Sequence, residues 1–88
     1  IFKKLPPRLP SLLFANDIYK RAKKANVSDG IALDWNKVEA VSRNLNEEKA
    51  GRALFEIVAA CRQTGLDPES CLRSFASNQM SILERQSR

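Results

Sequence analysis

The chain has 88 residues, a formal net charge of +5, 43% hydrophobic residues and 28% charged residues. This length suits one domain, because so short a chain does not build two independent cores. The composition is that of a globular chain rather than a disordered one. No apolar run approaches the roughly 18 to 20 residues that cross a bilayer, so no membrane partner is expected.

The residue types exclude several kinds of chemistry. There is no His, which removes Ser-His and Cys-His nucleophile pairs. Cys61 and Cys71 are the only cysteines, too few for the usual zinc site or a disulfide scaffold. We therefore predict a reducing, cytoplasmic location, with both thiols as fillers of the core. The chain begins at Ile1 without Met or a secretory signal, so we expect a piece of a longer polypeptide.

The first ten residues contain Pro6, Pro7 and Pro10, which predict an extended lead-in over residues 1–10. Ser11 is expected to cap the next helix through its hydroxyl. Apolar residues at helical spacing predict that helix over residues 12–25.

Four cations lie on this predicted helix, namely Lys20, Arg21, Lys23 and Lys24. Together with the net charge they would suit an anionic partner such as a nucleotide, a nucleic acid or an acidic protein surface. Stacking on bases is not indicated, because Tyr19 falls on the apolar stripe of the helix. We interpret the four cations as a solvated helix face, and nucleic acid is not the expected partner.

Residues 26–30 have the composition of a turn. Asp34 is placed to cap a short second helix whose apolar face consists of Val38, Val41 and Leu45. Asn46 is placed to cap a third helix, with Glu47 and Glu48 favourably located near its positive end.

The third helix has the strongest periodicity in the chain. Its expected core stripe, which Phe55 and Ala59 widen, consists of Ala50, Ala53, Leu54, Ile57, Val58 and Cys61. Gly65 is expected to end this helix in a left-handed conformation. Asp67, Pro68 and Glu69 then predict the start of a last helix that reaches about Gln86.

These elements predict an all-α fold, a small antiparallel bundle of about four helices forming a single domain over residues 11–88. The apolar arc of the third helix is wider than one neighbouring helix covers. We therefore expect a homodimer or a companion domain to complete the bundle. The alternative is that Phe55 packs on the proline-rich lead-in.

Short motifs in the chain resemble those of the MazG family of nucleoside-triphosphate pyrophosphohydrolases. Leu-Pro-Ser-Leu-Leu at residues 9–13, with Ile-Tyr-Lys-Arg-Ala at residues 18–22, is similar to the opening helix of that family. Asp34-Trp35 resembles the start of its second helix. Gly-Arg-Ala-Leu-Phe at residues 51–55 resembles Gly-Asp-Leu-Leu-Phe, and residues 65–73 resemble its last turn and helix.

The resemblance implies an all-α, normally dimeric pyrophosphatase fold that splits a nucleoside triphosphate into monophosphate and pyrophosphate with Mg²⁺. Active members use a Glu-x-x-Glu pair on the second helix and a Glu-x-x-Asp pair on the third. Carboxylates three residues apart project to one side of a helix, so two facing pairs form an oxygen cage for Mg²⁺.

This chain departs from that pattern at the ligand positions. The pair on the third helix falls on Lys49 and Arg52, so cations replace both acids. The pair on the second helix falls on Glu47 or Glu48, whose partners three residues on are Ala50 and Gly51. Trp35 also lies only sixteen residues before Gly51, closer than the family usually has it. The Asn and Lys of the family's last helix fall on Ala76 and Asn78.

Glu47 and Glu48 are candidate Mg²⁺ ligands, and Lys49 and Arg52 are candidate phosphate-binding residues. The alternatives are acids at a helix start and a solvated basic face. The sequence thus favours a MazG-like module that has lost independent catalysis and serves dimerisation or nucleotide sensing. One alternative is an active Mg²⁺-dependent enzyme with ligands from other residues or another chain. The other is a basic helical module that binds nucleic acid.

Overall fold

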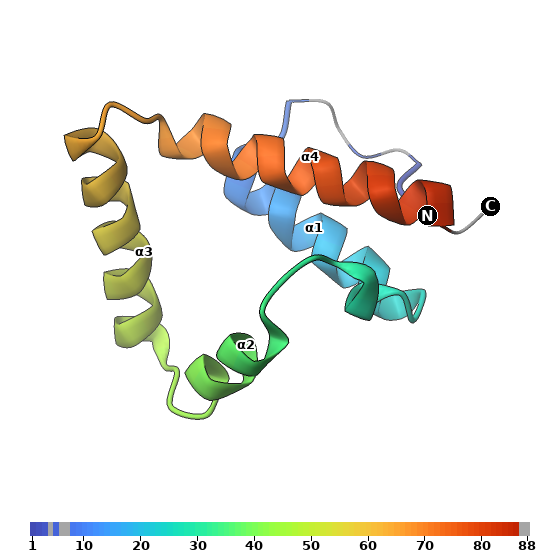
Figure 1. The fold of residues 1–88 in the computed structure, drawn as a ribbon, viewed down its shortest axis with the longest axis horizontal. Helices are drawn as coiled ribbons and strands as arrows, with labels where there is room; N and C mark the ends of the chain where they lie inside the picture. Colours follow the sequence, from blue (N-terminus) through green and yellow to red (C-terminus); the bar gives the residue numbers. More distant parts are fainter. Residues whose placement is uncertain (4, 6–7, 87–88) are drawn as a thin grey trace. The chain divides into compact units, whose positions relative to one another are not determined.

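The computed structural model describes residues 1–3, 5 and 8–86, and every regular element in this part of the chain is a helix (Figure 1). The elements follow in the order α1 (Ser11–Lys24), the 3-10 helix η1 (Ser28–Gly30), α2 (Trp35–Ser42), α3 (Glu47–Gln63) and α4 (Pro68–Gln86). The predicted all-α fold with four α-helices is confirmed. Within the described residues, no helix combines the length and apolar character needed to cross a bilayer.

The chain divides into two units, one formed by Ile1–Ala32 with Glu69–Arg88 and the other by Leu33–Pro68. Every described residue that is buried belongs to the first unit, and this core consists of Phe2, Ser11, Phe14, Ile18, Ala22, Ile31, Ala76, Gln79 and Leu83. The second unit contains α2 and α3 and has no buried residue. A single domain over residues 11–88 stays a prediction.

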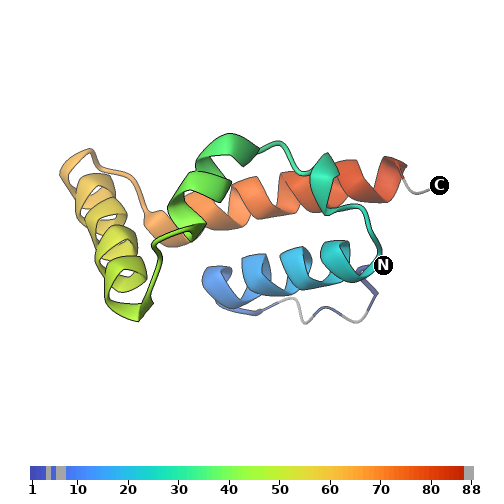
Figure 2. The same ribbon diagram turned by 90° about the horizontal axis from the view of Figure 1, so that it is seen from below.

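Helices α1 and α4 of the first unit lie side by side (Figures 1 and 2). The first residue of α1, Ser11, is hydrogen-bonded to Glu69 near the start of α4. Gly30, beyond the end of α1, lies so close to Leu83 that an added Cβ would be 3.1 Å from its side chain. The two helices therefore run parallel, whereas the sequence predicted an antiparallel bundle. The difference arises because residues 33–68 lead the chain back to the end where α1 begins.

The expected hydroxyl cap at Ser11 is wrong. Ser11 is the first residue of α1, and Pro10 at the N-cap position has no side-chain acceptor. The Ser11 backbone N–H instead donates to both carboxylate oxygens of Glu69, at 3.0 and 3.1 Å. The Ser11 hydroxyl donates to the Glu69 backbone carbonyl oxygen at 2.6 Å. A residue of another helix therefore satisfies the start of α1.

The lead-in has no regular secondary structure in its described part, in agreement with the sequence, and Pro6 and Pro7 lie outside the described residues. It packs partly into the first unit, since Phe2 is buried. The Arg21 guanidinium donates to the backbone carbonyl oxygens of Ile1 and Lys3 at 3.3 and 2.6 Å. These bonds hold the beginning of the lead-in near the end of α1.

The helix ends of the second unit follow the sequence closely. Asp34 Oδ1 accepts from the Lys37 backbone N–H at 3.2 Å, and Asn46 Oδ1 accepts from the Lys49 backbone N–H at 2.9 Å. Both caps were predicted. Gly65 has a positive φ of 77°, and the N–H of Leu66 donates to the Cys61 carbonyl oxygen at 2.8 Å. This is the bonding pattern of a helix that ends on a left-handed glycine.

The two glycines of the second unit give a matched test of this helix end. Gly65→Ala should destabilise α3 by about 1–2 kcal/mol, because an L side chain is strained in the left-handed region. Gly51→Ala should stabilise α3 by about 0.5–1 kcal/mol, since Gly51 lies within the helix and an added Cβ meets no atom within 4 Å. Urea unfolding followed by circular dichroism measures both changes. Equal effects of the two substitutions would contradict the left-handed cap.

The predicted core stripe of α3 is not a core within this chain. Phe55 and Ile57 are 72% and 63% exposed, and no residue of α3 is buried. The alternative that Phe55 packs on the lead-in stays a prediction. Cys61 is half-buried and Cys71 is exposed, so the expectation that both fill the core is wrong. Helical periodicity identified an apolar face, but a face becomes core only where another segment covers it.

Candidate functional site

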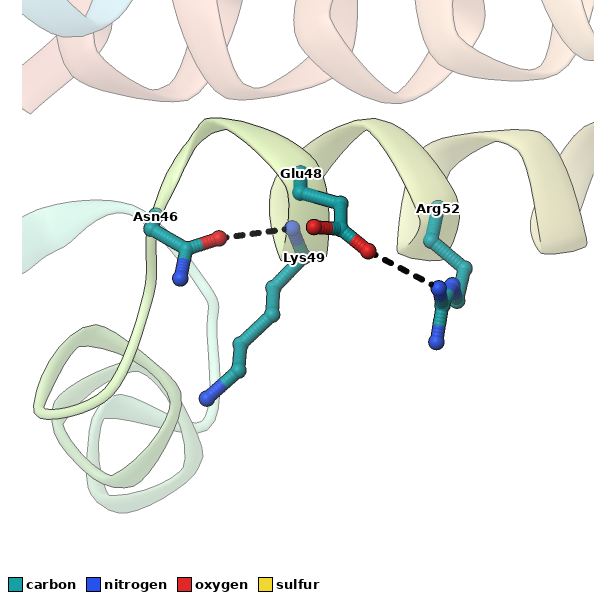
Figure 3. Close-up of polar contacts among 4 residues, drawn as sticks. All are labelled: Asn46, Glu48, Lys49 and Arg52. Carbon is teal, nitrogen blue, oxygen red and sulfur yellow. Dashed lines mark hydrogen bonds and ion pairs between the residues drawn. The ribbon is translucent and has the colours of Figure 1, made fainter.

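The sequence candidates lie together at the start of α3, close to its cap (Figure 3). Glu47, Glu48, Lys49 and Arg52 are all exposed. The cap bond from Asn46 orients the first turn, and Glu47 and Glu48 lie in that turn, where their charge is favourable against the helix dipole. The interpretation of both acids as helix-start residues therefore has a local structural basis.

Glu48 and Arg52 form an ion pair across one helical turn, with 3.0 Å between Oε1 of Glu48 and the Arg52 guanidinium (Figure 3). Both side chains are largely exposed, so the pair contributes little stability. The pair bears on metal binding, because the Arg52 guanidinium is bound to Oε1 of Glu48, an oxygen that a metal ion would need as a ligand. The Lys49 ammonium extends away from this pair and forms no ion pair with any described residue.

The acids at the start of α3 are not assembled into a cage. Positions 50 and 51, three residues after Glu47 and Glu48, hold Ala and Gly and supply no side-chain oxygen. Across the described ranges, no three side chains of His, Cys, Asp or Glu gather where they could hold a metal ion. Lys49 and Arg52 also add two positive charges near these acids, and positive charge opposes the binding of Mg²⁺.

A second candidate surface is the apolar side of α3. We name it the α3 stripe and define it as Ala50, Leu54, Ile57, Val58 and Cys61, which recur at helical spacing. Its large members are exposed, and the same helical period places Arg52 and Gln63 on the opposite side of α3. The α2 helix adds exposed Val38 and Val41 to the same unit. An apolar surface of this kind is typical of a protein-binding site.

The polar residues that organise the first unit were missed by sequence reasoning. Glu69 binds the start of α1, and Gln79 Oε1 accepts from the Ala32 backbone N–H at 2.9 Å. Arg73 donates to the Leu9 carbonyl oxygen, and its guanidinium lies 5.0 Å from the centre of the Phe14 ring. Gln79 had a weak signal, since it is a polar residue at helical spacing between the apolar residues Ala76 and Leu83. Glu69 and Arg73 had none, because their partners are distant in the sequence.

Comparisons with protein-family models, with curated proteins and with solved structures find no match to this chain. The resemblance to the MazG family therefore rests on the motifs in the sequence.

Proposed function

We propose that this chain is a MazG-like helical module that associates with a second copy of itself through the α3 stripe and has lost metal-dependent pyrophosphohydrolase activity. The observation that carries the proposal is the exposure of the stripe in a unit without a buried residue. Isolated helices as short as α2 and α3 gain little stability from propensity alone. They require an apolar partner surface.

A second copy is the partner that the charges favour. Residues 33–68 contain five Lys or Arg residues and six Asp or Glu residues, so two copies of this unit repel each other little. The stripe itself is uncharged, and Arg52, on the opposite side of α3, is paired with Glu48. A two-fold pairing would bury the same stripe on both chains, as in most small homodimers.

The lost activity is supported by the replacement of acids with cations at the third-helix ligand positions. Lys49 and Arg52 stand where the family pattern has carboxylates, and Glu48 is paired with Arg52. A divalent cation gains its binding energy from anionic oxygens, so this arrangement is repulsive toward it. Without a metal to neutralise the triphosphate and activate water, that hydrolysis has no catalyst here.

Association is tested by analytical ultracentrifugation of the chain from about 1 to 200 μM. We expect a dimer, and Ile57→Glu should weaken it by at least about a hundredfold, because a buried unpaired charge and a lost apolar contact cost about 3 kcal/mol together. The matched control is Gln63→Glu, which adds the same charge on the opposite side of α3 and should leave the dimer intact. A wild-type chain that stays monomeric at 200 μM would contradict the proposal.

Catalysis is tested separately, by pyrophosphate release from a panel of nucleoside triphosphates with Mg²⁺ or Mn²⁺. We expect no release above the buffer rate. Robust turnover abolished by Glu47→Gln or Glu48→Gln would show that these carboxylates serve as ligands and would refute the loss of activity. Turnover that survives both substitutions would also refute it, and would place the ligands elsewhere.

A further inference from the structure

The net positive charge of this protein comes from one of its two units. Ile1–Ala32 and Glu69–Arg88 contain ten Lys or Arg residues and four Asp or Glu residues, whereas Leu33–Pro68 contains five and six. The net positive charge of the first unit alone is therefore larger than that of the whole chain, because the second unit has one more acid than base. Within it, four cations fall within five consecutive positions at the end of α1.

Three of these cations lie on the solvent side of α1. The core side of the helix consists of Ser11, Phe14, Ile18 and Ala22. Lys20, Lys23 and Lys24 are exposed, and their ammonium groups form no ion pair or hydrogen bond with a described residue. Lys23 and Lys24 follow Lys20 by three and four residues, so both side chains leave the helix surface next to that of Lys20.

The fourth cation, Arg21, shapes this surface. Its bonds to the Ile1 and Lys3 carbonyl oxygens bring the lead-in, with exposed Lys3, to the same end of α1. Two surface depressions result, one lined by Asp17, Lys20, Arg21 and Lys24 and the other by Ile1, Arg21, Lys24 and Ala25. Asp17 is the one acid that lines them, and it forms no ion pair with a described residue. The surface is therefore strongly positive.

Tyr19 lies beside these lysines and does not belong to the apolar core as the sequence suggested. It is 40% exposed, and Lys23 follows it by one helical turn. An exposed aromatic ring among cations is the combination that binds a single nucleic-acid strand, because bases stack on the ring while cations contact the phosphates.

We propose that the solvent side of α1 binds single-stranded nucleic acid, with Lys20, Lys23 and Lys24 contacting phosphates and Tyr19 stacking on a base. An anionic membrane fits this surface less well. A helix that inserts into a bilayer interface needs an accessible apolar face, and the apolar face of α1 is buried in the first unit. The exposed leucines of α1, Leu12 and Leu13, lie about two turns away from the lysines.

The test is fluorescence anisotropy of a labelled 20-nucleotide oligo(dT) titrated with the full chain. We expect a dissociation constant of about 1–100 μM at 50 mM salt. The logarithm of the association constant should fall with the logarithm of the salt concentration with a slope of about −2, from three contacts at about 0.7 each. No binding at 50 mM salt with 200 μM protein would overturn the proposal.

Two charge-matched variants separate a local surface from net charge. The triple substitution Lys20→Gln, Lys23→Gln and Lys24→Gln should weaken binding at least about tenfold and flatten the salt dependence. The control triple substitution Lys37→Gln, Arg43→Gln and Arg62→Gln removes the same charge from the other unit and should change binding less than about twofold. Equal losses in the two variants would overturn the assignment to α1. Circular dichroism checks that both remain helical.

Tyr19 and the ligand class are tested in the same assay. Tyr19→Ala should weaken binding at least about fivefold, and Tyr19→Phe should retain it, because stacking requires only the ring. For a duplex of the same length, Tyr19→Ala should leave the dissociation constant unchanged, since the bases of a duplex are already stacked on each other. Co-sedimentation with vesicles containing phosphatidylserine provides the remaining comparison. Binding to the vesicles without binding to the oligonucleotide would overturn the proposal in favour of a lipid surface.

Discussion

Leu83→Ala is expected to lower the free energy of unfolding by about 2–5 kcal/mol. Leu83 is an apolar core residue near the end of α4 and is only 1% exposed. Gly30 packs directly against it, at a position where even an added Cβ would be crowded. Truncation would leave a cavity that a core of so few residues does not refill.

The matched control for Leu83→Ala is Leu12→Ala, which deletes the same atoms from a side chain that is 54% exposed. We expect the control to change stability by less than about 0.5 kcal/mol. Urea unfolding, followed by circular dichroism at a fixed protein concentration, measures both variants. If the two leucines proved equivalent, Leu83 would not belong to the core described above.

Glu69→Ala is expected to destabilise the first unit by about 1–3 kcal/mol. The Glu69 carboxylate is the acceptor for the backbone N–H of Ser11, a residue with no exposed surface. Its removal leaves that N–H without a partner and removes the negative charge from the positive end of α1. The bond from the Ser11 hydroxyl goes to the Glu69 main chain and remains available.

Glu56→Ala provides the control for Glu69→Ala, since it removes the same charge from an exposed position of α3 and should change stability by less than about 0.5 kcal/mol. Glu69→Gln should give an intermediate loss, because its amide oxygen still accepts one hydrogen bond but carries no charge. The same urea experiment compares the three variants. A loss for Glu69→Ala no larger than that for Glu56→Ala would show that the tie between α1 and α4 contributes nothing.

The predictions for Leu83 and Glu69 concern the first unit because all of the buried residues that the structure describes belong to it. The second unit presents the opposite case, in which apolar residues are arranged for burial but remain exposed. Its stability should therefore depend on protein concentration if the α3 stripe pairs with a second copy, as association stabilises only the folded form. The proposed nucleic-acid surface lies on α1 in the first unit, so the two proposals can fail independently.

Local signals allowed much of the fold to be predicted. Asp34, Asn46 and Gly65 end or begin helices where the sequence placed them, because capping involves atoms within a few residues of each other. The positions of Glu47 and Glu48 in the first turn of α3 followed from the same reasoning. The candidate site could be located in this way, whereas the ion pair of Glu48 with Arg52 is seen only in the structure.

The sequence by itself determined which segments are helical and which side of each helix is apolar, since both depend on short-range spacing. Tertiary structure decided which apolar sides become core. Phe14, Ile18 and Leu83 are buried. Leu54 and Ile57 belong to the α3 stripe, which has the stronger helical periodicity, and yet they are exposed. It also decided that Glu69, rather than Ser11 itself, completes the start of α1. The physical reason is that burial and long-range hydrogen bonds depend on which distant segments meet, and periodicity within one helix carries no information about that.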